Sequence, residues 1–235
     1  MKRRNEQKMM VLVACEESQE VCKAFRARGH EAYSCDLQEC SGGHPEWHIK
    51  QNVLYYLNPR INLCGAEYID FFTRDGEYHL IPGKWDLIVA HPPCTYLTSV
   101  GASRLFNKDH TVKDINREKR GWDAKSFFMQ CLNADCEKIA VENPAPMRYY
   151  QLPNYTQIIE PYMFGDPWKK RTCLWLKGIP ALTPTNVVNP IGCWTIQTGG
   201  STCRLKLKGP PGAKTAKERS KTFPGIAKAM AEQWG

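Results

Sequence analysis

The feature that most constrains the fold is a set of short apolar runs, each of which leads into a polar segment. Residues 9–15 read MMVLVAC, and similar runs occupy residues 31–35, 86–90 and 138–141. Runs of this length without polar alternation are typical of strands buried on both faces of a parallel sheet. Between the first two runs, residues 18–28 have apolar side chains at helical spacing and end at Gly29. We therefore predict a doubly wound α/β fold that begins with a strand–helix–strand unit.

The rest of the chain extends this plan. We predict a long polar loop over about 95–116, a helix around 122–132, a strand at 172–176 and a closing helix at 226–234. Residues 178–212 are rich in Pro, Gly, Thr and Asn, which indicates a loop-rich lobe. The predicted organisation is a catalytic core over 1–177, a small basic recognition lobe over 178–221, and a segment over 222–235 that returns to the core.

Polar residues follow four of the predicted strands. In doubly wound sheets, ligands bind at the carboxyl ends of the strands, so we expect these residues to meet in one crevice. They are Glu16 and Glu17, Asp36, the Pro92-Pro93-Cys94 turn, and Glu142 with Asn143.

The loop after the first strand reads Cys15-Glu16-Glu17-Ser18 and contains no glycine. Two carboxylates would repel a pyrophosphate, but they suit a ligand that carries sulfonium and ammonium groups, such as S-adenosylmethionine. The alternative is that the glutamates interact with the positive amino end of the following helix. Asp36 is placed to bind ribose hydroxyls.

Cys94 follows two prolines, which give it a stiff, extended backbone. A cysteine in such a turn is either structural or a nucleophile. A nucleophile must ionise, and we expect neighbouring cations or amide dipoles to lower its pKa. The acid Glu142 at the end of another predicted strand favours the nucleophile.

Three segments carry a family resemblance. Residues 88–95 (IVAHPPCT) resemble the Pro-Cys motif of the DNA cytosine C5-methyltransferases, and residues 140–144 (AVENP) resemble their Glu-Asn motif. Residues 165–171 (GDPWKKR) are similar to the Gly-x-Pro-Gln-x-Arg segment of that family. Order and spacing agree over about 9–177, as in short bacteriophage-type members. The resemblance implies a Rossmann-like class I S-adenosylmethionine-dependent methyltransferase fold.

The resemblance also implies a mechanism and a site. Cys94 would add to carbon 6 of cytosine, Glu142 would stabilise the activated ring, and carbon 5 would accept the methyl group from a base flipped out of the duplex. Lys170 takes the arginine position of the third motif, with Arg171 beside it. The residues that we assign to S-adenosylmethionine or a close derivative are Cys15, Glu16, Glu17, Ser18, Asp36, Leu37, Asn52 and Pro92. Asn52 stands where the family has an acid, and the glycines of the family's first loop are missing.

The charge pattern points to a polyanionic partner. The net charge is +8, and basic residues gather at 169–171 and between 204 and 221. We therefore expect double-stranded DNA to be the partner, bound largely through phosphate contacts. Three alternatives are C5 modification of a pyrimidine in RNA or a free nucleotide, a non-catalytic DNA-binding relative, and a merely solvated basic tail.

The chain has 11 cysteines, an odd number, and no segment typical of secretion or of a membrane span. We expect a monomer with reduced thiols in the cytoplasm, that of the bacterial host if the chain is phage-encoded. Cys35, Cys40, His44 and His48 lie close enough in sequence to hold zinc, but their spacing is atypical and our prediction is no metal.

Overall fold

The computed structural model describes residues 8–195, 212–213 and 215–235, and its centre is a seven-stranded sheet. The strands of this sheet are β1 (Met10–Ala14), β2 (Glu31–Asp36), β3 (His48–Lys50), β7 (Leu87–Ala90), β8 (Ile139–Asn143), β9 (Gln157–Ile159) and β11 (Thr172–Lys177). Their order is β3-β2-β1-β7-β8-β11-β9. The first five in this order run parallel, and β11 runs antiparallel to both β8 and β9. The predicted α/β fold with a large parallel sheet is confirmed.

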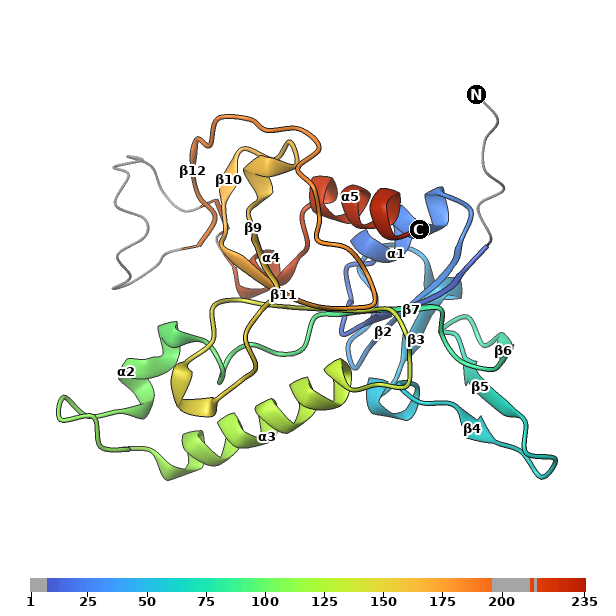
Figure 1. The fold of residues 1–235 in the computed structure, drawn as a ribbon, viewed down its shortest axis with the longest axis horizontal. Coiled ribbons are helices and arrows are strands. Elements are labelled where there is room, and N and C mark those ends of the chain that lie inside the picture. Colours follow the sequence, from blue (N-terminus) through green and yellow to red (C-terminus); the bar gives the residue numbers. More distant parts are fainter. Residues whose placement is uncertain (1–7, 196–211, 214) are drawn as a thin grey trace.

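Helices cover both faces of the sheet (Figure 1). Helices α1 (Glu20–Ala27) and α5 (Pro224–Trp234) lie on one face, and α3 (Ile115–Leu132) lies on the other. Successive side chains of β1 point to opposite faces of the sheet, and each face has its own hydrophobic core. Val11 and Val13 pack with α1 and α5, whereas Leu12 and Ala14 belong to the core that contains Phe128 of α3. Both faces of β1 are therefore buried, which explains its unbroken apolar sequence.

Helix α3 begins earlier than predicted, at Ile115 rather than near Trp122. Its amino end is fixed by Asp114, whose side-chain oxygen accepts a hydrogen bond from the Arg117 amide at 2.8 Å. The segment predicted as an irregular loop also holds a short helix, α2 (Ala102–Leu105). The described residues also form five single 3₁₀ turns: η1 (Pro45–Trp47), η2 (Val53–Tyr55), η3 (Ser99–Gly101), η4 (Arg148–Tyr150) and η5 (Pro161–Met163).

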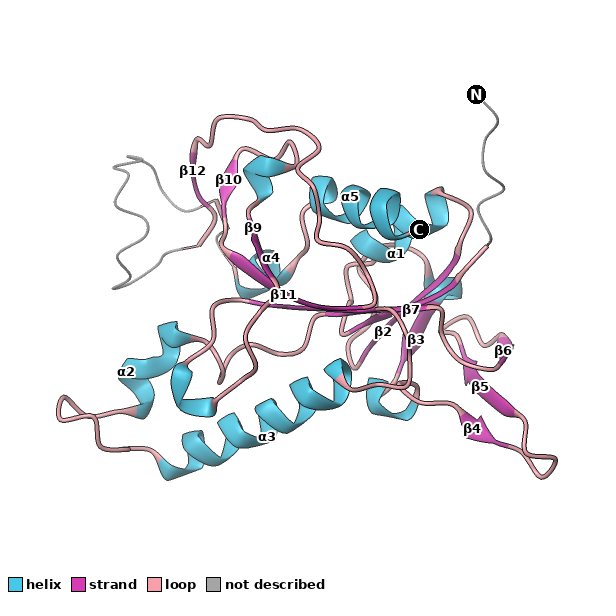
Figure 2. Ribbon diagram, viewed as in Figure 1, coloured by secondary structure: helices cyan, strands magenta, loops and turns pink. Residues whose placement is uncertain are grey.

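A second, three-stranded antiparallel sheet was not predicted (Figure 2). It consists of β4 (Arg60–Ile61), β5 (Glu67–Phe72) and β6 (Tyr78–Pro82). Ile69, Phe71 and Ile81 point from this sheet into the main core, and all three are buried. The indole of Trp85, just before β7, stacks on Phe71 of β5 and donates a hydrogen bond to the Tyr56 carbonyl at 2.7 Å.

The predicted basic lobe lies partly outside the described residues, which omit 196–211 and 214. What is described of it consists of a two-residue strand, β12 (Gly192–Cys193), paired with β10 (Trp168–Lys169), and the short helix α4 (Ala216–Ser220). Cys193 is disulfide-bonded, contrary to our expectation of reduced thiols, while nine other cysteines are free. The domain boundaries at 177 and 221 stay a prediction. No helix in the described ranges is long and apolar enough to cross a membrane.

Candidate active site at the carboxyl edge of the sheet

The polar residues that follow the parallel strands meet at one edge of the sheet, as predicted. Ala14 of β1 is in register with Cys35 of β2 and with Ala90 of β7, and Ala90 is in register with Val141 of β8. The next residue on each of these strands is therefore a lateral neighbour of the others. This row consists of Asp36, Cys15, His91 and Glu142.

Cys94 lies in a tight turn at this edge. Its carbonyl accepts hydrogen bonds from the amides of Leu97 and Thr98, both at 3.1 Å. The preceding Pro92 is buried, and its carbonyl accepts a hydrogen bond from the Asn143 side chain at 3.2 Å. The turn after β7 is thus fastened to the end of β8, which holds the half-buried thiol next to Glu142.

The electrostatic surroundings of Cys94 differ from our expectation. Burial raises the pKa of the thiol and the Glu142 charge raises it further, whereas the Lys170 ammonium and a backbone hydrogen bond oppose this effect without cancelling it. The expected lowering of the pKa is therefore wrong for the protein without substrate. The thiol carries its proton in this state, and ionisation requires a proton acceptor.

Glu142 is held by a residue that the sequence reasoning missed as a functional group. His91 Nδ1 lies 3.2 Å from Glu142 Oε2, and both side chains are largely buried. Burial alone would raise the pKa of Glu142. The hydrogen bond to His91 and the charge of Lys170 outweigh burial, so the pKa of Glu142 lies below its ordinary value. Glu142 is consequently an ionised carboxylate at neutral pH.

The two basic residues assigned to the site lie in different surroundings. Lys170 influences both Cys94 and Glu142, and its ammonium also donates to the Lys221 carbonyl at 3.4 Å. The Arg171 guanidinium instead donates to the Tyr155 hydroxyl at 3.4 Å. Because successive side chains of an extended segment point in opposite directions, only one of the two can face the thiol. The structure brings Lys170 to the site and directs Arg171 away from it.

The loop after β1 adopts a backbone conformation that glycine usually supplies. Cys15 and Gln19 have φ angles of 59° and 61°, in the left-handed region. The Gln19 side chain is fully buried and compensates by pairing with the loop after β2. Its amide nitrogen donates to the His44 carbonyl at 2.8 Å, and its oxygen accepts from the His44 amide at 3.1 Å. The loop therefore keeps its shape without the glycines of the family that it resembles.

The two glutamates of this loop differ in their partners. Glu16 accepts hydrogen bonds from the amides of Val21 at 2.7 Å and Cys22 at 3.2 Å, so it caps the amino end of α1. This is the alternative that the sequence left open, and it occupies both carboxylate oxygens of Glu16. Glu17 is also buried, but among the described residues neither of its carboxylate oxygens has a hydrogen-bond partner. Its nearest cation is Lys217 Nζ, at 3.5 Å.

The other residues assigned to the cofactor lie along the same edge. Asp36 accepts a hydrogen bond from the Gln38 amide at 2.8 Å, and Leu37 beside it is 71% exposed. Asn52 caps the 3₁₀ turn η2, because its side-chain oxygen accepts from the Leu54 amide. The Ser18 side chain is buried, and burial raises the pKa of the Cys15 thiol well above its usual range; the assignment of both to the cofactor stays a prediction.

The zinc alternative finds no geometric support. His48 Nδ1 lies 2.9 Å from the Ser34 hydroxyl and its Nε2 lies 2.9 Å from the Gln38 carbonyl, which uses both ring nitrogens. His44 stacks on Trp47. Across the described part of the chain, no three His, Cys, Asp or Glu side chains are grouped so that they could hold a metal ion.

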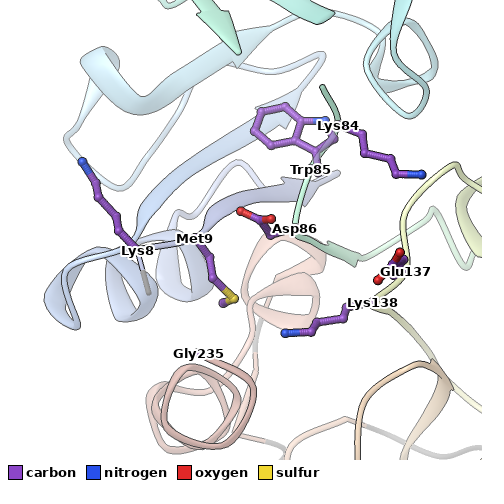
Figure 3. A pocket seen from close by; sticks show the side chains of 8 residues that line it. All are labelled: Lys8, Met9, Lys84, Trp85, Asp86, Glu137, Lys138 and Gly235. Atoms are coloured by element: carbon purple, nitrogen blue, oxygen red, sulfur yellow. The ribbon is translucent and has the colours of Figure 1, made fainter. Parts of the chain in front are cut away.

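A cavity of about 460 Å³ lies at the opposite edge of the sheet (Figure 3). Its lining includes Met9, Asp86 and Lys138, which directly precede β1, β7 and β8. Since the candidate site follows the carboxyl ends of these strands, the cavity in Figure 3 is separate from it.

Comparisons with known proteins give a distant match. No protein-family model matches the chain, and no curated protein matches it. One solved structure that it resembles is described as the structure analysis of the Entamoeba histolytica methyltransferase EhMeth, with 14% sequence identity and a TM-score of 0.41. The match covers 78% of this chain and 58% of the other, so the chain spans less than two thirds of that protein's length.

Proposed function

We propose that this chain is an S-adenosylmethionine-dependent methyltransferase that modifies carbon 5 of cytosine in double-stranded DNA through a covalent Cys94 adduct. The observation that carries the proposal is the pairing of a thiol with an ionised carboxylate at the ends of two adjacent parallel strands. Cys94 follows β7, Glu142 is the penultimate residue of β8, and the Lys170 ammonium acts on both.

The two side chains supply complementary chemistry. The Glu142 carboxylate takes the thiol proton, and the Cys94 thiolate forms a bond to carbon 6 of the pyrimidine. The electron pair of the 5,6 double bond shifts toward carbon 4 and nitrogen 3, and nitrogen 3 accepts the proton from Glu142. Carbon 5 becomes nucleophilic and would take the methyl group of S-adenosylmethionine, whose carbon–sulfur bond breaks to leave the neutral thioether S-adenosylhomocysteine; nitrogen 3 then returns its proton to Glu142. Loss of the carbon 5 proton to water restores the ring and expels the thiolate.

The residues at the neighbouring strand ends fit a nucleoside cofactor that carries a positive charge. Glu17 is a buried carboxylate without a hydrogen-bond partner among the described residues, which suits an ammonium group. Asp36 suits ribose hydroxyls, and the exposed Leu37 suits a purine face. S-adenosylmethionine would supply an electrophilic methyl group beside the base.

The charge supports a nucleic-acid substrate. The chain has 32 Lys and Arg against 24 Asp and Glu, and the Lys170 ammonium acts on both Cys94 and Glu142. A thiol inside the crevice is out of reach of a stacked base, so the target cytosine must leave the duplex. RNA or a free nucleotide is the second candidate substrate.

Nucleoside mass spectrometry of DNA from cells that express the protein tests the proposal. We expect 5-methylcytosine with the wild-type protein and none with Cys94→Ala. Cys64→Ala removes an exposed cysteine and serves as the matched control that keeps activity. Equal modification by Cys94→Ala would overturn the mechanism.

A trapping experiment identifies the substrate. DNA, RNA and free nucleotide that contain 5-fluorocytosine are incubated with the purified protein and cofactor. We expect a stable covalent complex with DNA, because fluorine blocks the loss of a proton from carbon 5. A complex with RNA or nucleotide alone would favour the second candidate.

A further inference from the structure

His91 occupies a position between the two halves of the candidate site. It directly follows β7, and its amide donates to the Ala14 carbonyl of β1 at 2.9 Å. Its Nδ1 lies 3.2 Å from Glu142 Oε2, and its side chain is only 8% exposed. On the other side its charge acts on Glu16, the carboxylate that caps α1. His91 therefore lies between the loop that we assign to cofactor binding and Glu142, the carboxylate that we assign as the general base.

The hydrogen bonding of His91 differs from that of a histidine used only for packing. His48 is also buried, but both of its ring nitrogens have partners. The imidazole of His91 has one hydrogen bond among the described residues, from Nδ1 to Glu142, and its Nε2 is buried without a partner. A buried ring nitrogen without a hydrogen bond costs free energy, so packing alone does not explain an imidazole at this position.

We propose that His91 is a positioning residue that orients Glu142 and keeps it ionised; this inference rests on the proposed function. The imidazole N–H bonds Oε2 and, together with a hydrogen bond from the Thr172 side chain, fixes the orientation of the carboxylate. A hydrogen bond to an ionised carboxylate stabilises the charged form, and Glu142 must be charged to take the thiol proton. The titratable and charged groups that face this pair are Glu16, Cys94, Lys170 and Cys173 of β11.

The replacement of His91 by Asn and by Ala separates positioning from packing. Asn has an amide N–H close to the place of Nδ1–H, whereas Ala has no donor. His110→Asn is the control, because His110 is exposed. We expect His91→Ala to lower kcat about 10- to 100-fold, the loss of one charge-assisted hydrogen bond, with a smaller change in KM for DNA. We expect His91→Asn to recover most of the loss.

The pH profile gives a readout that a purely structural role would not move. Without the His91 hydrogen bond the pKa of Glu142 rises, so the acidic limb of kcat should shift to higher pH in His91→Ala and stay in place in His91→Asn. Equal kcat values and an unshifted limb in His91→Ala would overturn the role of His91.

A measurement that does not depend on activity keeps the two proposals distinguishable. Carbon-13 NMR titration of the glutamate carboxyls reports the pKa of Glu142 directly, and circular dichroism confirms that each variant is folded. We expect the pKa of Glu142 to rise in His91→Ala but not in His91→Asn. An unchanged pKa refutes the inference even if the enzyme is active. An inactive wild-type protein that shows the shift refutes the proposed function alone.

Discussion

The two adjacent glutamates of the first loop should respond to mutation in opposite ways. Glu16 accepts two backbone hydrogen bonds at the amino end of α1, whereas Glu17 accepts none from the described residues. Replacement of Glu16 by Ala should therefore destabilise the fold, and replacement of Glu17 by Ala should instead weaken cofactor binding.

The expected loss of stability in Glu16→Ala follows from the backbone amides that lose their hydrogen-bond acceptor. Glu16→Ala leaves the buried amides of Val21 and Cys22 unpaired, at a cost of about 1–3 kcal/mol each. Burial raises the pKa of Glu16, so its removal also relieves the cost of a buried charge and offsets part of this loss. We expect a net loss of about 2–4 kcal/mol, or a decrease in Tm of about 5–15 °C for a domain of this size.

Glu17→Ala breaks only a 3.5 Å ion pair with Lys217, whose side chain is 57% exposed. Exposed partners contribute little, so the change in unfolding free energy should stay within about 0.5 kcal/mol. Differential scanning calorimetry measures Tm, and isothermal titration calorimetry with S-adenosylmethionine measures affinity. If Glu17→Ala lowers Tm as much as Glu16→Ala, or if it binds the cofactor as tightly as the wild-type protein, the assignment of roles is wrong.

Three further predictions concern the thiol, the core and metals. Because burial and Glu142 raise the pKa of Cys94, iodoacetamide should alkylate Cys94 more slowly at pH 8 than the exposed Cys64, and Lys170→Met should slow the alkylation of Cys94 further. Peptide mass mapping measures both alkylation rates. Faster labelling of Cys94 than of Cys64 would contradict the raised pKa. An added Cβ at Gly121 would lie 2.0 Å from the Tyr150 hydroxyl, so Gly121→Ala should cost about 1–3 kcal/mol, and an unchanged urea midpoint would show that this contact can relax. EDTA should leave Tm unchanged, since no metal-binding group is found across the described ranges, and a decrease would revive the zinc alternative.

The central strands could be predicted because a strand that is buried on both faces consists of an unbroken run of apolar residues. Every side chain of β7 is buried, and such a strand has no polar position to obscure the pattern. The small sheet was missed although β5 alternates inward Ile69 and Phe71 with outward Tyr68 and Asp70, and Asp75-Gly76 marks the turn that follows it. The amino half of α3 was missed because its side chains are mostly exposed and carry no apolar period.

The candidate site was predictable as far as residue type and strand position determine it. Cys94 and Glu142 follow apolar runs, so their meeting at one edge follows from a parallel sheet. The role of Glu16 depends on whether its carboxylate reaches the α1 amides, and the contact of His91 depends on register across two strands that are far apart in sequence. The divergence of Lys170 and Arg171 is the exception, because alternation along an extended segment already implies it.

The loop at Cys15 and Gln19 bears on how such sites can be found. A left-handed backbone costs a residue with a side chain about 1–2 kcal/mol, and here the buried Gln19 amide offsets that cost by binding the neighbouring loop. A loop can therefore hold a left-handed backbone without glycine where a buried side chain fixes it against a neighbouring loop. Loops of this shape are better recognised by their torsion angles than by a glycine pattern in the sequence.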